Sequence, residues 1–172
     1  MAGADPIEPY VIAAVPVPGG GRIGLCRLPG RSGDLAGDLD AVRAFGASMV
    51  VTMNPLAELE AKGAADLPVE AARRGLAWRH FPIPDYGAPA DDALWSALAA
   101  ELHGLLDVGG TALLHCAGGK GRSGMAAMRL LVERGVPPGE ALARLRAARP
   151  GAVETAAQES WAALPHGGPA GR

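Results

Sequence analysis

The sequence predicts an α/β fold with a central, largely parallel, mixed sheet that carries helices on both faces. Short apolar segments typical of strands alternate with longer segments rich in helix-forming residues, and this alternation favours parallel strands joined by helices. A glycine-rich turn follows one apolar segment, at residues 117–121, where open α/β sheets place their ligand sites. The length of 172 residues suits a single domain, whose core we expect at about 10–164.

In the first half of the chain, apolar runs and turn residues predict the elements. Pro and Gly bound two strand-like segments, at 10–17 and 22–28. The next elements are expected in this order: a helix at 34–46, a strand at 48–53, a helix at 55–62 and a short helix at 68–75. A strand at 76–83 follows, because its apolar residues alternate with polar ones.

The second half is predicted in the same way. A helix at 91–107 begins at Asp91 and Asp92, which we expect to act as its N-cap and first-turn acid. The apolar run TALLHC predicts a buried strand at 111–116, and helices are expected near 123–134, 138–148 and 153–164. Residues 1–9 and 165–172 are expected to be flexible, since the Gly and Pro of the tail cannot bury a core.

Composition excludes several classes of function. With 16 basic and 18 acidic residues the net charge is −2, so the overall field gives no sign of nucleic-acid binding. No segment is long and apolar enough to span a membrane, and the N-terminal segment lacks the basic region of a secretory signal. We therefore expect a cytoplasmic protein. The four histidines show no metal-ligand spacing, and no cofactor is expected.

Cysteines and arginines have plain structural interpretations. Cys26 and Cys116 are far apart and form no disulfide framework. We expect Cys26 to be a half-buried strand residue, with a redox partnership with Cys116 as the alternative. Two arginine groups are expected to form solvated faces, with docking of an anionic substrate as the alternative. They are Arg73, Arg74 and Arg79, and Arg144, Arg146 and Arg149.

The most informative segment is HCAGGKGRSG, residues 115–124, which places five residues between Cys116 and Arg122. Its glycines permit a tight ring whose N–H groups point inward. A segment rich in helix formers follows, so the ring lies at a helix N-terminus, where free amides and the dipole favour an anion. We therefore predict a phosphate-binding loop made of Ala117, Gly118, Gly119, Lys120, Gly121 and Arg122.

The same loop predicts a reactive thiol at Cys116. A helix N-terminus and a nearby cation favour the thiolate form of cysteine. The planar guanidinium of Arg122 suits two oxygens of a tetrahedral anion, so this pair is expected to act as nucleophile and oxyanion clamp. A buried, inert cysteine is the structural alternative. The glycines and the following Ser123 and Gly124 favour the functional interpretation.

The arrangement His-Cys, two residues, Gly, two residues, Arg, Ser, Gly resembles the signature loop of cysteine-dependent protein tyrosine and dual-specificity phosphatases. The resemblance extends from about residue 22 to 164. RLPG, PIPDYGAP and GAVETAAQESW are most similar to the phosphatase type associated with cyclin-dependent kinases and its bacterial counterparts. The resemblance implies the fold of that family. It also implies a reaction in two displacement steps at phosphorus, with a phosphocysteine intermediate between them.

Phosphate ester cleavage also needs a proton donor for the leaving oxygen. Asp85 is the candidate, because it lies in the loop PIPDYGAP after the strand predicted at 76–83. Dual-specificity phosphatases carry an acidic Asp about thirty residues before the nucleophile, and Asp85 precedes Cys116 by 31 residues. A turn aspartate is the structural alternative.

The resemblance also implies roles for four further residues. Ser123 is expected to be catalytic: it would hydrogen-bond the Cys116 sulfur and ease its departure in the second step, with a helix-start residue that satisfies backbone donors as the structural alternative. His115 is expected to orient the loop by bonding to backbone, with a purely structural histidine as the alternative. Lys120 either adds charge at the pocket mouth or points to solvent. Gln158 resembles a glutamine that positions the hydrolytic water, although a polar residue on a terminal helix is more often exposed.

These observations predict a protein phosphatase that acts on phosphotyrosine and, through a shallow pocket, on phosphoserine and phosphothreonine. The expected partner is a phosphorylated protein or small phosphorylated substrate. Lys120 motivates one alternative, a phosphatase for phosphoinositides or other small polyanions, although Ala117 stands where such lipid phosphatases carry a second lysine. A phosphate-binding module without turnover is the other alternative.

Overall fold

The computed structural model describes residues 9–164, so the expectation about residues 1–8 and 165–172 lies outside the described part. A five-stranded sheet has the order β1-β2-β5-β3-β4. The strands are β1 (Ala13–Pro16), β2 (Arg22–Arg27), β3 (Met49–Thr52), β4 (Ala77–His80) and β5 (Thr111–Cys116). Only β1 pairs antiparallel, with β2, and the other pairs are parallel. The predicted largely parallel mixed sheet is confirmed.

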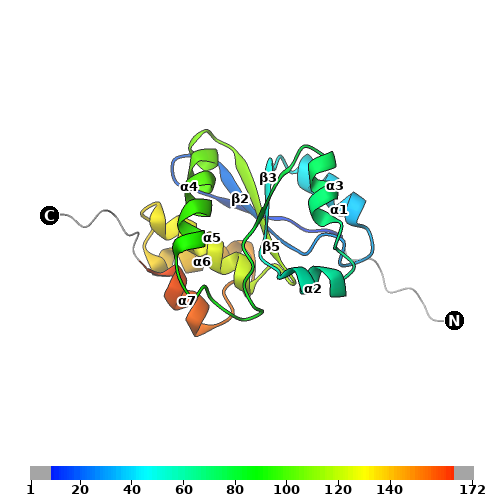
Figure 1. Ribbon diagram of the computed structural model, residues 1–172. Helices are drawn as coiled ribbons and strands as arrows, with labels where there is room; N and C mark the ends of the chain where they lie inside the picture. Colours follow the sequence, from blue (N-terminus) through cyan, green and yellow to red (C-terminus); the bar gives the residue numbers. More distant parts are fainter. Residues whose placement is uncertain (1–8, 165–172) are drawn as a thin grey trace.

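Helices cover both faces of this sheet (Figure 1). They are α1 (Leu35–Ala44), α2 (Leu56–Ala61), α3 (Leu67–Arg73), α4 (Ala93–Asp107), α5 (Gly121–Glu133), α6 (Pro138–Ala148) and α7 (Ala156–Ala162). The larger apolar core packs α4 to α7 on one face, and two smaller clusters pack α1 to α3 on the other. No helix within residues 9–164 has the length and apolar character needed to cross a membrane.

Most predicted boundaries shift by one or more residues in the structure. The first strand begins at Ala13 rather than residue 10. The strand predicted to 83 ends at His80, because Pro82 and Pro84 cannot donate to a ladder. The helix expected from 123 begins at Gly121. The last helix begins at 156 rather than 153, because Val153 has a φ of 63° and Thr155 is the N-cap.

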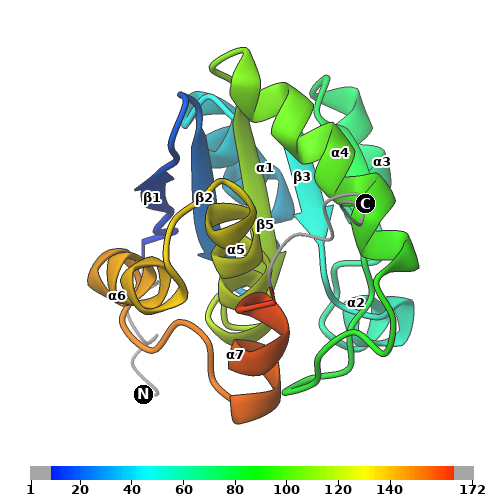
Figure 2. The same cartoon turned by 90° about the vertical axis from the view of Figure 1, so that its left-hand side faces the viewer.

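The central strand β5 is buried along its whole length and leads into α5, so both elements position the loop between them (Figure 2). In the sheet, Cys116 lies opposite Arg27 of β2 and His115 lies opposite Thr52 of β3. Neighbouring side chains of a strand point to opposite faces. Leu114 therefore packs in the larger core, called the α5 core below. Leu113 packs in the cluster that contains Leu39 and Val42 of α1, called the α1 core below.

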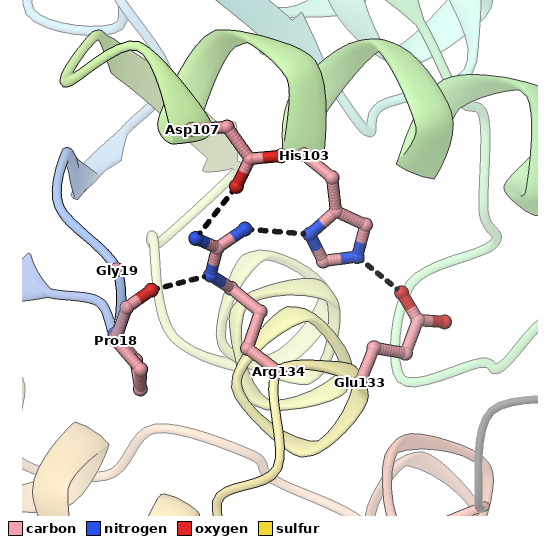
Figure 3. Close-up of a pocket in the computed structure, with 6 residues that line it drawn as sticks. All are labelled: Pro18, Gly19, His103, Asp107, Glu133 and Arg134. Atoms are coloured by element: carbon pink, nitrogen blue, oxygen red, sulfur yellow. Dashed lines mark hydrogen bonds and ion pairs between the residues drawn. The ribbon is translucent and has the colours of Figure 1, made fainter.

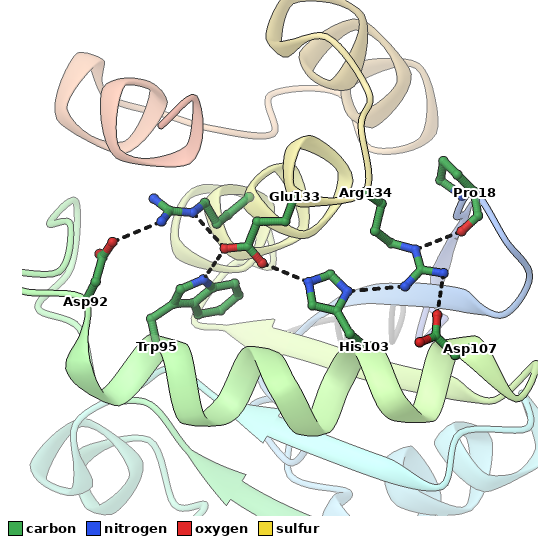
Figure 4. Close-up of polar contacts among 8 residues, drawn as sticks. Pro18, Asp92, Trp95, His103, Asp107, Glu133 and Arg134 are labelled. Atoms are coloured by element: carbon green, nitrogen blue, oxygen red, sulfur yellow. Dashed lines mark hydrogen bonds and ion pairs between the residues drawn. The ribbon is translucent and has the colours of Figure 1, made fainter. Parts of the chain in front are cut away.

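A chain of polar contacts joins α5 to α4 (Figure 4). The buried Glu133 carboxylate accepts hydrogen bonds from Trp95, Arg129 and His103. Arg134 donates to His103 Nδ1, to Asp107 and to the carbonyl of Pro18. A cavity of about 440 Å³ is lined by His103, Asp107, Glu133 and Arg134, together with Pro18 and Gly19 (Figure 3). Its charged groups pair with one another and so help to hold α5 against α4.

Candidate active site

The predicted anion loop connects β5 to α5 at the carboxyl edge of the sheet. Cys116 ends β5 and is 3% exposed. Its Sγ atom lies 3.4 Å from the Oγ atom of Ser123, the contact expected of this pair. The first helical hydrogen bond runs from the N–H of Gly124 to Lys120. The amides before Gly124 in α5 therefore have no intrahelical partner, which suits an anion.

Only part of the predicted glycine requirement holds. Gly119 has a φ of 72°, and a Cβ atom there would lie 2.3 Å from the backbone carbonyl of Cys26. At Gly121 a Cβ atom would lie 2.3 Å from Oε1 of Glu154. Gly118 has open space around its missing Cβ and needs no glycine for steric reasons. Close packing of the loop on β2 is therefore the main constraint.

Arg122 is buried, 1% exposed, and its guanidinium contacts three segments. Nη1 and Nη2 donate to the two carboxylate oxygens of Glu58 at 2.8 and 2.9 Å, and Nη1 donates to the carbonyl of Ile83 at 3.0 Å. Nε is buried and has no hydrogen-bond partner within residues 9–164. Burial opposes the charged form, but the hydrogen bonds that Arg122 donates to Glu58, together with the charges of Cys116, Glu58 and Asp85, outweigh burial and hold the pKa of Arg122 above its usual value.

Glu58 on α2 is a site residue that the sequence analysis missed. The hydrogen bond from Arg122 lowers the pKa of its carboxyl group, although partial burial acts in the opposite direction. The Asn54 amide also acts on this carboxyl group but lies outside hydrogen-bond geometry, so both of its polar atoms are buried without a partner. An acidic residue on a short amphipathic helix gives no signal that separates it from a surface charge.

The structure brings Asp85 to the loop across 31 residues of sequence. Its Oδ1 lies 3.2 Å from Nη2 of Arg122, and its side chain is 54% exposed. The next residue, Tyr86, has a φ of 60° and donates its backbone N–H to Asp85 Oδ1 at 3.0 Å. The carboxylate therefore lies beside the buried guanidinium and still reaches solvent, as a proton carrier requires.

The prediction that Asp91 and Asp92 cap the following helix is only partly correct. Asp92 is at the N-cap position but makes no side-chain capping bond. Its carboxylate instead accepts from Arg129 and from the indole of Trp161, because the buried arginine is a stronger donor than a backbone amide. Asp91 accepts from the N–H of Ala93. Neither residue contacts the loop.

His115 was expected to bond to backbone. The backbone of Cys116 acts on the pKa of its ring, but its Nδ1 is buried without a hydrogen-bond partner within residues 9–164. Its Nε2 lies 2.7 Å from the hydroxyl of Thr52, which also accepts from the indole of Trp78. Burial lowers the pKa of His115 to about 3, so the ring is neutral at physiological pH. The structure therefore favours the structural alternative, in which a neutral side chain ties β5 to β3 beneath the loop.

Gln158 was expected to be exposed on the last helix, and that is also wrong, because it is fully buried. Its side chain completes a capping box with Thr155 and also donates to the carbonyl of Gly87 at 3.2 Å. Gly87 belongs to the loop that carries Asp85, which is called the acid loop below and comprises residues 84–89. The structure thus brings Gln158 to the acid loop.

The expectation of two solvated arginine faces is wrong for Arg146 and Arg149. Arg149 donates to the carbonyls of Gly118 and Gly119, at 2.8 and 3.2 Å, and Arg146 donates to the carbonyls of Ala152 and Val153. The carbonyl groups of a tight loop need hydrogen-bond donors. The spacing of the arginines in the sequence does not show that they supply these donors.

The remaining arginines form surface ion pairs, as expected. Arg144 pairs with Glu140, Arg73 with Glu70, Arg74 with Glu70 and Asp40, and Arg79 with Glu101.

Two cations border the loop and have no acidic partner within the described residues 9–164. Arg31 donates to the carbonyl of Ala117 at 2.9 Å, and the exposed Lys120 has its side chain beside Gly151.

Cys26 is fully buried rather than half-buried and accepts a hydrogen bond from the hydroxyl of Tyr10. Burial raises the pKa of its thiol to about 12. Cys26 packs in the α1 core, whereas Cys116 packs in the α5 core.

A cysteine at the base of a strand–loop–helix anion site, with a buried arginine and an aspartate from a neighbouring loop, defines a cysteine-dependent phosphatase. Comparison with known families gives the same class of enzyme and also identifies the family. The chain belongs to the PTP-SAK family, described as Swiss Army Knife protein, DSP-PTPase phosphatase domain, whose model matches residues 33–162. The protein is thus a cysteine-dependent protein phosphatase of the dual-specificity type.

Curated relatives and solved structures agree with this family. The mouse protein cyclin-dependent kinase inhibitor 3 is 31% identical over 146 residues, which cover 81% of this chain and 69% of the relative. The pig protein of the same name is 32% identical over 147 residues, with the same coverage.

Among solved structures, kinase associated phosphatase with its catalytic-site cysteine replaced by serine superposes with a TM-score of 0.82. It is 26% identical and covers 91% of this chain and 93% of its own. Tk-PTP in the active form has a TM-score of 0.67, 31% identity and coverage of 87% and 92%. The two alternatives to a protein phosphatase are not favoured by these matches.

Proposed function

We propose that Cys116 is the nucleophile, Arg122 the phosphate clamp and Asp85 the general acid of this phosphatase. In the first step the Cys116 thiolate attacks phosphorus, the ester P–O bond breaks, and Asp85 gives its proton to the departing oxygen. In the second step water attacks phosphorus, the S–P bond breaks, and Asp85 takes a proton from the water. The Ser123 hydroxyl stabilises the sulfur as it leaves.

The observation that carries this proposal is the unpartnered Nε of Arg122. A buried N–H without a partner costs about 1–3 kcal/mol, and this one belongs to a guanidinium that Glu58 already fixes in direction. A phosphate oxygen would satisfy it. The backbone amides at the start of α5 would bind the remaining oxygens, and Gly118, Gly119 and Lys120 complete the predicted ring.

Asp85 fits the acid role because of its neighbours. Its Oδ1 atom lies 3.2 Å from Nη2 of Arg122, the proposed phosphate clamp, so a bound phosphate ester would lie beside it. The exposed side chain of Asp85 lets first the leaving oxygen and then the attacking water reach its carboxyl group.

We propose phosphorylated proteins as the substrates, with phosphotyrosine and also phosphoserine and phosphothreonine as targets. The family and the kinase-related names of the relatives support a phosphoprotein. The exposed Asp85 and Tyr86 at the site support a shallow approach, which also admits the shorter phosphoserine side chain.

Hydrolysis of aryl phosphates by two variants tests the assignment. We expect Cys116→Ser to abolish turnover while the protein still folds. We expect Asp85→Ala to slow turnover about 100-fold with poor leaving groups and much less with good ones. Wild-type turnover by Cys116→Ser would refute the nucleophile, and an equal loss by Asp85→Ala for all leaving groups would refute the acid.

A further inference from the structure

The side chain of Gln158 uses both ends of its amide on backbone groups of two different segments. Oε1 accepts from the N–H groups of Glu154 and Thr155, at 2.9 and 3.3 Å, at the start of α7. Nε2 donates to the carbonyl of Gly87 at 3.2 Å, 71 residues away. The residue is fully buried, so these bonds form in an environment where an unpaired amide is costly.

Thr155 makes a second link between the same two segments. Its hydroxyl accepts from the N–H of Gln158 at 3.2 Å, as an N-cap does. The same hydroxyl donates to the carbonyl of Tyr86 at 3.2 Å. The two residues of the α7 capping box therefore donate to the carbonyls of Tyr86 and Gly87, the two residues that directly follow Asp85.

The acid loop needs such support because its backbone is strained. Tyr86 has a φ of 60°, a left-handed conformation that a bulky residue adopts at a cost of about 1–3 kcal/mol. Such a conformation persists where surrounding contacts fix it. Here the fixing contacts are the bond from Thr155 to the carbonyl of Tyr86 and the bond from Gln158 to the carbonyl of Gly87.

The start of α7 is itself fixed to the nucleophile loop. The N–H of Val153 donates to the carbonyl of Lys120, and the missing Cβ of Gly124 lets α5 approach the backbone of Val153. Farther along α7, Arg129 of α5 donates to the carbonyl of Trp161 at 2.8 Å. One continuous set of contacts thus runs from the phosphate loop through α7 to the acid loop.

Resting on the proposed function, we propose that Thr155 and Gln158 are positioning residues that hold Asp85 at the leaving-group oxygen by tying the acid loop to α7. Gln158 acts through the carbonyl of Gly87, to which Nε2 donates one of its two N–H groups. This role differs from the water-positioning glutamine that the sequence resemblance implies.

The variant Gln158→Glu tests this role with almost no change of shape. Glutamate keeps an oxygen that accepts from the N–H groups of Glu154 and Thr155, but its carboxylate cannot donate to Gly87. We expect turnover of phenyl phosphate, a poor leaving group, to fall about tenfold, and turnover of p-nitrophenyl phosphate to change by less than about twofold. The pH profile is recorded for both substrates.

A double-mutant cycle with Asp85→Ala separates the tether from the acid assignment. If Gln158 acts through Asp85, Gln158→Glu has no further effect in the Asp85→Ala background. An equal loss on both substrates, or a full additional loss in the Asp85→Ala background, overturns the tether. If Asp85→Ala itself lacks leaving-group dependence, the acid assignment fails instead.

Thr155 supplies an independent pair of variants in case Gln158→Glu does not fold. Thr155→Val removes the hydroxyl, and we expect the same leaving-group dependence as for Gln158→Glu. Thr155→Ser keeps the hydroxyl and is expected to restore turnover. Val42→Ala, which truncates a buried residue in the α1 core, is the control for general destabilisation and should lower the Tm without leaving-group dependence. Failure of Thr155→Ser to rescue overturns the proposal.

Discussion

Arg122 joins three segments of the site through one guanidinium group. Glu58 on α2, Ile83 before the acid loop and Asp85 within it all contact its terminal nitrogens. Because the guanidinium is planar and its donors have fixed directions, these contacts determine where Nε points. The direction of the open donor is therefore set by residues outside the signature loop.

Arg149 supports the opposite side of the same loop. Replacing it with Gln removes the donors to the carbonyls of Gly118 and Gly119. We expect kcat/KM for p-nitrophenyl phosphate to fall about tenfold, because two partly buried hydrogen bonds are lost at roughly 1 kcal/mol or less each. Arg144→Gln, in α6, which ends at its C-cap Arg149, removes a pair with exposed Glu140 and is the matched control. Equal kinetics for the two variants would contradict a role for Arg149.

Candidate residues whose type fits a chemical role could be named from the sequence. Residues that only support the loop or Arg122 could not. Cys116, Arg122 and Asp85 could be named from motif and spacing, because a nucleophile, a clamp and an acid need particular residue types. Glu58 and Arg149 lie on helices where charged residues are the rule. Their functions depend on carbonyls and on one guanidinium that only the folded chain brings to them.

At the scale of elements, α5 is the support of the site. Its first turn carries the anion loop, and its last residue, Glu133, anchors it to α4 through Trp95 and His103. Arg129 adds bonds to Glu133, Asp92 and the backbone of α7. Contacts along one helix thus connect the proposed phosphate site to α4 and α7.

This anchor predicts an acid-sensitive stability. Glu133 is nearly buried, which would raise the pKa of its carboxyl group, but hydrogen bonds from His103, Trp95 and Arg129 lower it from 4.5 to about 2. A lowered folded pKa stabilises the protein above pH 4.5, and the stabilisation is lost as pH falls towards 2. The difference corresponds to roughly 3 kcal/mol.

Urea unfolding between pH 7 and pH 2.5 measures this effect. We expect the free energy of unfolding of the wild type to fall more steeply below pH 4.5 than that of Glu133→Gln, which is less stable at pH 7. Glu140→Gln, at a surface pair, should keep the wild-type slope. Parallel curves for the wild type and Glu133→Gln would refute the assignment.

The order of elements could be predicted because apolar runs and turn residues mark each one. Their ends were less predictable where tertiary contacts determine them. The last helix begins at Ala156, since Thr155 caps it while also binding the acid loop, and Val153 is held in a left-handed conformation against Lys120. Local propensity contains no information about such partners.

At the scale of the whole molecule, charge is unevenly compensated. Many arginines away from the site pair with carboxylates, such as Arg73, Arg79 and Arg134. Arg31, Lys120 and Arg149 at the loop have no carboxylate within 4.0 Å among residues 9–164. In a chain with a net charge of −2, these three cations thus give the loop a local positive charge.

This distribution predicts a salt dependence for acidic phosphopeptides. Between 0.05 and 0.5 M NaCl we expect kcat/KM to fall about fivefold, because the Debye length shrinks from about 14 Å to about 4 Å over this range. Lys120→Gln should weaken the dependence, whereas Arg43→Gln, at the end of α1, should not. A peptide with neutral flanks should respond less. An unchanged slope in Lys120→Gln would rule out its contribution.

Gly119 packs the loop between β5 and α5 directly against the sheet, because a Cβ atom there would overlap the carbonyl of Cys26 in β2. A larger side chain must displace either the loop or a strand of the core. Evolution therefore cannot adjust substrate preference at this position independently of foldability. Specificity has room to diversify at Lys120 and along the acid loop, while Gly119 is inaccessible to gradual change.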